Sequence, residues 1–287
     1  MRKPERDRWV PALGMFGGFQ LQEASGKIEP GQLNPAAPRC TPQPVQCEIS
    51  DQIQPSSDGD DDILAVRLGL SLEIMTPRLA EVPGDPRLFV HVDPIYVEGF
   101  ERNIAGTGNP GSMTESFLPP PVTRSDENVY NGQGTRIFAE VSPLVVGAGI
   151  GVALSFEILE HTVRVRPSAE YLTERLSVTG QVNRVVQVAQ NPRPRTPSDF
   201  RFIALRDVDR KRYHAVGAGL DVELDADRLG PIVLTPFMGA RAFHFLGDLD
   251  VDLSDTNEFG EMAEWHFERE EWQWEARLGI RLRWLPR

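Results

Sequence analysis

The C-terminal segment has the clearest pattern of hydrophobic and polar positions in the chain. Every second position is apolar, namely Trp272, Trp274, Ala276, Leu278, Ile280, Leu282 and Trp284. Three arginines, a glutamate, a glutamine and a glycine occupy the positions between them. Alternate side chains of a strand point to opposite faces, so the segment predicts a strand with one apolar and one charged face.

The length of this strand and its tryptophans indicate a membrane. The ten residues from Trp274 to Trp284 extend roughly 33 Å at about 3.3 Å per residue. At a tilt of about 40° such a strand spans about 25 Å, the height of the apolar band of an outer-membrane barrel. Aromatic side chains are enriched at both membrane–water interfaces, so Trp272, Trp274 and Trp284 are predicted interface anchors.

Seven further segments alternate with the same period of two. The eight predicted strands cover approximately residues 9–22, 63–74, 88–100, 135–157, 162–177, 213–224, 232–245 and 272–285. Their connections are long, short, long, short, long, short and long in turn. The prediction is an all-β, eight-stranded antiparallel up-and-down transmembrane β-barrel with short periplasmic turns and long outer loops, formed by residues 1–287 as one domain.

Two segments break the alternation. Polar Arg136, Glu140 and Ser142 occupy even positions, whereas the even positions after Pro143 are apolar, which predicts a change of face at a bulge near Pro143. Ala263, Trp265 and Phe267 are out of phase with the tryptophans that follow, which predicts a second bulge near residues 269–271. The segment before that bulge is interpreted as a strand extension above the membrane or as an aromatic contact surface.

The polar faces of the predicted strands carry a nearly balanced set of seven arginines, six carboxylates and one histidine. This set is Arg67, Glu73, His91, Asp93, Arg164, Arg166, Glu170, Asp221, Glu223, Arg241, Glu275, Arg277, Arg281 and Arg283. The interior of an eight-stranded barrel is just wide enough for side chains to fill. Buried charges need partners, and the arginine fork suits carboxylates, so the pattern predicts a lumen closed by salt bridges. Glycines on the fourth and sixth strands are expected to leave room for long arginines.

Composition excludes some classes of protein. A net charge of −12 argues against nucleic acid as a partner. A transmembrane helix is excluded because no run of about 18 apolar residues occurs. Cys40 and Cys47 are the only cysteines, and their spacing without a nearby histidine fits a zinc site poorly. A local disulfide in an oxidising compartment is favoured over two free thiols.

These alternating strands and their connections resemble the OmpA/OmpX-type small barrels of Gram-negative outer membranes. The resemblance covers nearly the whole chain and rests on pattern, without a diagnostic motif. It implies a bacterial outer-membrane location, with the lipid bilayer and lipopolysaccharide as partners. Such proteins commonly end on an aromatic residue, whereas this chain ends with Trp284 followed by Leu-Pro-Arg.

Candidate chemistry in the sequence is sparse. A deacylase would need a serine beside a histidine and an acid. His91 and Asp93 share an inward face, but the pattern places no serine with them, so a structural histidine is favoured. The acidic runs at 58–62 and 248–255 lack the glycine and glutamate spacing of an EF-hand. No metal site and no cofactor are therefore expected.

Three functions fit these observations. The first is a non-enzymatic outer-membrane barrel with a structural or surface-interaction role, whose long outer loops could contact a protein partner. The second is an outer-membrane enzyme that modifies lipid or peptide. The third is a soluble lipocalin-like carrier of a hydrophobic ligand, which would explain why residues 1–8 lack the apolar core of a signal peptide. The three tryptophans on one strand face argue against the carrier.

Overall fold

The computed structural model of the chain describes residues 8–29, 41–42, 45–46, 57–98, 100–107, 134–158, 161–187, 200–257 and 262–285. The regular elements of this part are β-strands. They are β1 (Val10–Glu29), β2 (Thr41–Pro42), β3 (Val45–Gln46), β4 (Ser57–Met75), β5 (Arg87–Val97), β6 (Phe100–Thr107), β7 (Gly134–Val141), β8 (Leu144–Ile158), β9 (His161–Gln187), β10 (Phe200–Leu224), β11 (Asp227–Leu229), β12 (Ile232–Leu246), β13 (Asp250–Thr256) and β14 (Met262–Trp284). None of the described residues belongs to a helix long and apolar enough to cross a membrane.

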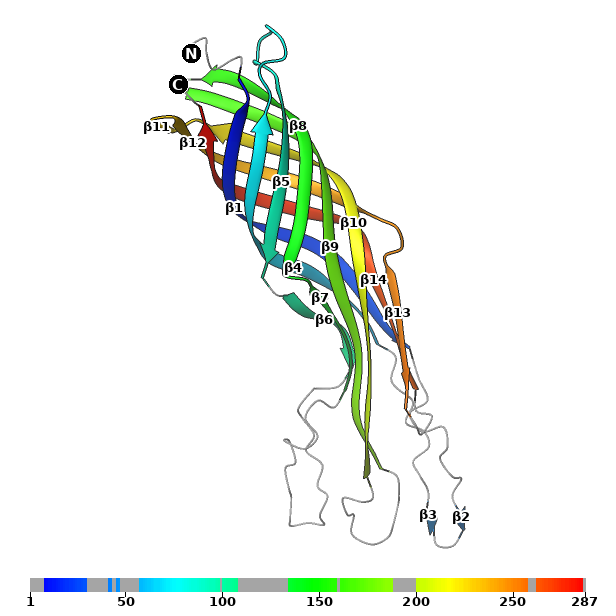
Figure 1. The fold of residues 1–287 in the computed structure, drawn as a ribbon. Coiled ribbons are helices and arrows are strands. Elements are labelled where there is room, and N and C mark those ends of the chain that lie inside the picture. The colour runs from blue at the N-terminus through cyan, green and yellow to red at the C-terminus, as the bar shows by residue number, and fades with distance from the viewer. Residues whose placement is uncertain are drawn as a thin grey trace.

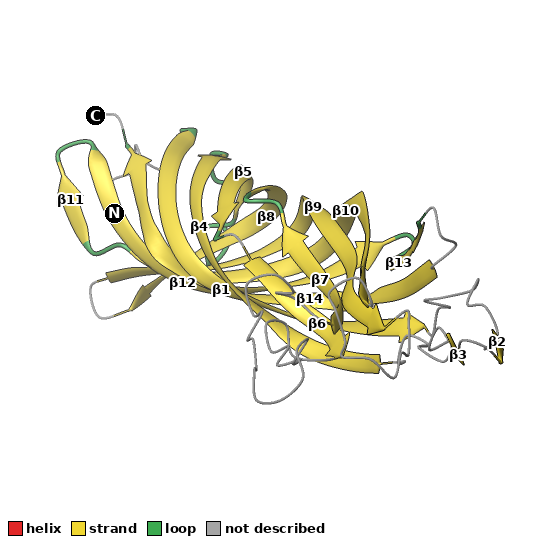
Figure 2. Ribbon diagram, turned by 90° about the horizontal axis from the view of Figure 1, so that it is seen from below, coloured by secondary structure: helices red, strands yellow, loops and turns green. Residues whose placement is uncertain are grey.

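Eight of the strands pair in a closed ring. The order is β1, β4, β5, β8, β9, β10, β12 and β14, and β14 pairs again with β1. All of these pairings are antiparallel, so the predicted all-β, antiparallel fold is confirmed. Seen from the end that carries the longest strands, the sheet curves round on itself (Figure 2). The closed pairing leaves the ring without a free edge.

Four more strands, β6, β7, β11 and β13, join the ring to make a sheet of twelve. β7 and β8 both pair with β9, so together they form one interrupted strand beside it. β6 pairs with β7, and β13 pairs with β14. These additions, apart from β11, lie toward the end of the ring opposite the short turns (Figure 1).

Several strands run much farther than predicted. β9 has 27 residues, β10 has 25 and β14 has 23. In Figure 1, β9 and β10 continue together well past the end of β8. Residues 178–187 and 200–212, which were predicted to lie in a long loop, therefore form strands, and residues 262–271 form the strand extension that was one of their two interpretations. We call this part of the sheet the extension, formed by β6, β7, β13 and the ends of β1, β4, β9, β10 and β14 remote from the short turns.

The two faces of the long strands exchange character along their length. On β9 the inward residues change from Arg166 and Glu170 to Leu176 and Val178. The outward residues change in the opposite sense, from apolar Val165 to Arg175 and Ser177. Since the inward positions stay even throughout, the residue type changes while the direction of the side chains does not.

The two predicted bulges are present, but the predicted change of face is wrong. Val146 pairs with Thr173 and Val141 with Leu176, so β7 and β8 contain two more residues than the facing part of β9. The β1–β14 register likewise shifts between Gln22 and Ala24. Shifting a strand by one residue would exchange its faces, whereas an insertion of two preserves them.

The inside of the extension is filled by an apolar cluster that continues into the ring as far as Phe16, Ile95 and Phe237. It contains Ile28, Ile137, Leu176, Val178, Val182, Phe245, Val251, Leu253, Trp265 and Phe267, all of them buried. Trp265 lies over Gly180, where an added Cβ would come within 2.3 Å of the indole. The segment around Trp265 is therefore a strand extension, and its interpretation as an aromatic contact surface is wrong.

Replacement of this tryptophan tests the independence of the extension. Trp265→Ala removes a buried aromatic side chain, a change that typically costs about 3–5 kcal/mol. We expect faster proteolysis at residues 177–187 of β9 and 200–212 of β10. On unheated gels the variant should still migrate as a compact, folded ring. Trp272→Ala, on an exposed outward position, serves as the control. Unchanged proteolysis of the Trp265 variant would contradict an extension held by this cluster.

Candidate functional site: the buried ionic network

The inward side chains of the ring form an ionic network near the short-turn end. The structure places thirteen of the fourteen predicted lumen residues there, each at most 6 % exposed: Arg67, Glu73, His91, Asp93, Arg166, Glu170, Asp221, Glu223, Arg241, Glu275, Arg277, Arg281 and Arg283. The fourteenth, Arg164, lies at the mouth with 11 % of its side chain exposed. β8 lines this region with glycines, such as Gly147 and Gly149, which leave space for the facing side chains. The network occupies three layers along the ring.

The layer nearest the short turns is centred on Glu223. Its carboxylate accepts hydrogen bonds from Arg166, Arg281 and Arg283. Arg166 also donates to Glu73 at 2.5 Å, and so links β9 to β4 across the ring. A single glutamate thus holds three guanidinium groups that come from two strands.

The middle layer is built on Asp93 and Asp221. Arg277 donates to Asp221 at 2.7 Å and to Asp93 at 3.2 Å. Arg241 donates to Asp93 at 3.1 Å. His91 Nε2 lies 3.1 Å from a Glu170 oxygen, so the histidine is part of the same layer.

The third layer contains residues that sequence reasoning missed. Arg67 donates to Gln20 at 2.5 Å and to Glu275 at 2.9 Å, and lies 3.4 Å from Glu174. Arg269 also binds Glu174. Glu174 occupies the same inward parity on β9 as Glu170, so parity alone would have found it. Arg269 was hidden by the predicted bulge beside it.

Aromatic rings cover the guanidinium groups of the network. Arg166 lies 3.9 Å over the Phe89 ring, and Arg281 lies 3.9 Å over that of Phe237. An aromatic face attracts a cation, which adds to the ion pairs. Gly151 leaves room for one of these rings, because a Cβ added there would lie 2.5 Å from Phe89. Of the glycines on the predicted fourth and sixth strands, Gly219 lies beside Arg241, as expected, whereas Gly149 lies beside His91 and Glu170.

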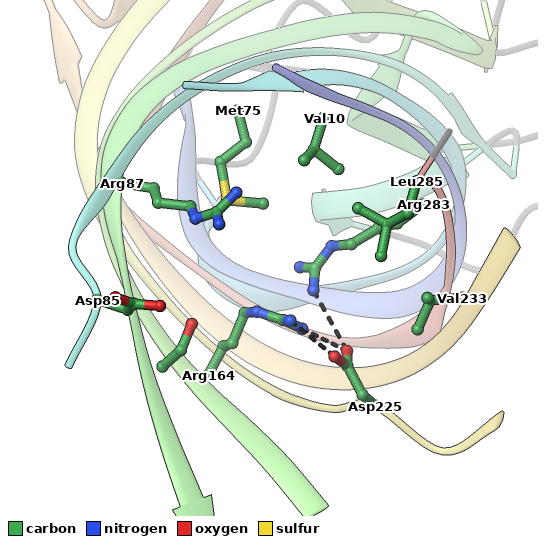
Figure 3. Close-up of a pocket in the computed structure, with 10 residues that line it drawn as sticks. Val10, Met75, Asp85, Arg87, Arg164, Asp225, Val233, Arg283 and Leu285 are labelled. Atoms are coloured by element: carbon green, nitrogen blue, oxygen red, sulfur yellow. Dashed lines mark hydrogen bonds and ion pairs between the residues drawn. The ribbon is translucent and has the colours of Figure 1, made fainter. Parts of the chain in front are cut away.

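Apolar side chains seal both ends of the network. Toward the short turns, Val10, Met75, Phe89 and Ala153 pack with Leu285. Beside them a cavity of about 30 Å³ opens at the mouth, where Arg164 and Arg283 both bind Asp225 (Figure 3). At the other end the apolar core of the extension begins.

The geometry does not form a catalytic triad. Ser168 donates to Glu170 at 2.6 Å, and His91 contacts the other oxygen of the same carboxylate. The serine is thus bonded to the acid and not to the histidine, whereas a nucleophilic serine needs the histidine as its base. The alternation of β9 places Ser168 on the same inward face as Glu170, but only the tertiary structure brings His91 of β5 to that carboxylate.

Possible metal ligands converge outside the ring. Within the described residues, Asp250, His266 and Glu268 bring one ligand atom each within 4.8 Å of one another. They lie on the outer face of the extension, and Asp252 contacts His266 Nδ1 at 2.7 Å. Cys40 and Cys47, the predicted disulfide, lie outside the described residues.

The three predicted anchor tryptophans all point outward. Trp272, Trp274 and Trp284 are 48 %, 58 % and 51 % exposed. The rings of Trp272 and Trp274 stack at 6.1 Å between their centres. Trp284 lies at the other end of the same strand, ten residues from Trp274.

The chain matches no protein-family model and no curated protein. Among solved structures it is similar to a major outer membrane protein of Thermus thermophilus, with 13 % identity and a TM-score of 0.31 over 93 % of this chain and 99 % of that one. It is also similar to a Pseudomonas aeruginosa FadL homologue, with 6 % identity and a TM-score of 0.20 over 97 % and 90 % of the two chains. Such TM-scores do not establish a shared fold or function.

Neutralising the central glutamate tests the network. Glu223→Gln keeps the size of the side chain but leaves three buried arginines short of a counter-charge, which costs about 3–5 kcal/mol. Glu81→Gln is the matched control, because Glu81 pairs with Arg78 at the surface and should cost under about 1 kcal/mol. The free energy of unfolding, from urea titration of protein folded in detergent, distinguishes them. Equal effects of the two substitutions would contradict the importance of the buried network.

Proposed function

We propose that this chain is a non-enzymatic bacterial outer-membrane β-barrel of the OmpA/OmpX type, with a structural or surface-interaction role. The observation that carries the proposal is a belt of exposed apolar side chains around a closed ring with an ionic interior. The belt includes Leu13, Met15, Phe19, Leu68, Leu70, Leu72, Val90, Val92, Leu144, Ile150, Val216, Leu220, Met238, Leu278, Ile280 and Leu282. Monomeric soluble proteins rarely expose apolar patches beyond a few hundred Å².

A closed ring with an apolar exterior suits a hydrocarbon environment. Every backbone donor and acceptor in lipid needs a partner within the protein, and a closed barrel meets this requirement. A soluble carrier of a hydrophobic ligand would need the opposite arrangement, with an apolar interior and a charged exterior. The ionic interior beneath the belt therefore disfavours the carrier.

The edges of the belt fit the two surfaces of a bilayer. Trp284 marks the edge near the short turns, and Trp272 and Trp274 mark the other. Tyr171 on β9 and His214 on β10 lie on the outer face of the ring, with the Tyr171 hydroxyl 2.6 Å from His214 Nδ1. Side chains with an apolar ring and a polar group favour membrane interfaces. By this proposal the extension stands in water on the outer side.

The role of the protein follows from what each region offers. The buried and paired charges favour a plugged lumen over a pore. Ser168 donates its hydrogen bond to Glu170 and not to His91, which disfavours an acyl-transfer enzyme. The extension presents a polar outer face on a sheet with an apolar core, which suits contact with a protein partner beyond the membrane. The lipid bilayer and lipopolysaccharide are the proposed membrane partners, and no nucleic acid is proposed.

Insertion of an arginine into the belt tests the membrane location. Leu70→Arg places a charge near the middle of the belt, where an arginine facing lipid costs about 2–4 kcal/mol. Val208→Arg places the same charge on the outer face of the extension and should change stability by less than about 0.5 kcal/mol. The measurement is unfolding after refolding into lipid vesicles. Wild-type protein that stays in buffer without detergent would overturn the proposal.

A plugged lumen also predicts the absence of ion conduction. The wild-type chain inserted into a planar bilayer should show no steady single-channel current, because the paired charges fill the ring. A channel-forming porin inserted under the same conditions is the control. A stable open current from the wild-type chain would contradict the plug while leaving the membrane location intact.

A further inference from the structure

A basic cleft lies on the outer wall just beyond the apolar belt. It has a volume of about 540 Å³ and lies between the junction of β7 with β8 and the strands β9 and β10. Its lining residues are Glu140, Ser142, Pro143, Arg175, Leu176, Ser177, Arg210 and Arg212. The guanidinium groups of three arginines and the hydroxyls of two serines, all hydrogen-bond donors, therefore line one cleft.

The positive charges of the three cleft arginines are not neutralised by ion pairs within the described part of the protein. Arg175 and Arg212 lie directly opposite each other in the β9–β10 register, and like charges in that position repel. Within the described residues, none of the three arginines forms an ion pair, and Glu140 is the one carboxylate that lines the cleft. This arrangement contrasts with a chain whose net charge is −12. An anion held between the arginines would remove the repulsion.

The position of the cleft indicates where such an anion comes from. Arg175 lies four residues beyond Tyr171 on β9, and Arg212 lies two residues beyond His214 on β10. At about 3.3 Å per residue, the Cα atoms of these arginines lie roughly 7–13 Å farther along their strands than those of Tyr171 and His214, the aromatic row that ends the belt there. If that row lies at the membrane interface, the cleft lies among the lipid headgroups. The apolar outer face of β8, β9 and β10 then faces the acyl chains.

We propose that Arg175, Arg210 and Arg212 bind a phosphate group of an anionic membrane lipid in the leaflet beside the extension. This proposal rests on the membrane location proposed above. The planar arginine fork binds phosphate oxygens in pairs, and the hydroxyls of Ser142 and Ser177 supply further donors. The bulge at Ser142 and Pro143 brings the first of these hydroxyls to the cleft. The site thereby fixes a lipid headgroup at one place on the wall.

Lipid retention by the purified full chain tests the site. Native mass spectrometry of protein in detergent, titrated with dioleoyl phosphatidylglycerol or dioleoyl phosphatidylcholine, gives the ratio of the two association constants. Each arginine near an anionic membrane surface contributes roughly fivefold in affinity. We therefore expect Arg175→Gln/Arg212→Gln to lower the phosphatidylglycerol preference at least about fivefold. Arg206→Gln, farther along β10 and outside the cleft, should leave the ratio unchanged.

The outcomes separate this site from the proposed function. An unchanged lipid ratio in the double variant, or an equal loss in the Arg206 variant, would overturn the headgroup site although the chain still inserts into vesicles. Failure of the wild-type chain to float with vesicles would instead overturn the membrane location. Inorganic phosphate alone should show no binding that depends on Arg175 and Arg212. Such binding would assign the cleft to a soluble anion.

Discussion

The cross-ring pairing of buried charges is the interaction on which the rest of the structure depends. Arg166 on β9 reaches Glu73 on β4, and Arg277 on β14 reaches Asp93 on β5. These strands are not neighbours in the ring, so the ion pairs connect opposite walls. An isolated charge at this depth would be very unfavourable, and its partner is present only when the ring is closed. Closure of the wall and pairing of the interior therefore require each other.

Around this network, one set of strands serves two environments. Within the belt, the strands point apolar side chains outward and charged side chains inward. In the extension, they point polar side chains outward and apolar side chains inward. On β9 and β1 the change occurs close to the bulges at Ser142–Pro143 and opposite Gln22–Ala24. Because each bulge inserts two residues, the strands continue in phase and the apolar core of the extension stacks directly on the ionic layers. The same bulge brings Ser142 to the basic cleft.

The alternation of side chains is a local property, and for that reason much of the ring could be predicted. A period of two identifies strands, and the charged face of residues 272–284 indicates an interior that is not apolar. The inward positions of Arg67, Asp221 and Glu223 follow from the same rule. The extension was missed because its polar residues face outward, so segments such as 178–187 have the composition expected of a loop. Glu174 was missed because the inward positions of β9 were followed only as far as Glu170, and Arg269 was missed because of the bulge predicted beside it.

The sequence by itself determined which residues share a face, because in a strand that depends only on the backbone geometry of adjacent residues. It also determined the near balance of arginines and carboxylates, since this is a matter of composition. Only the tertiary structure decided which arginine meets which carboxylate, because partners such as Arg67 and Glu174 come from strands on different sides of the ring. The tertiary structure also decided where the apolar belt ends, since that level depends on the register of all eight strands.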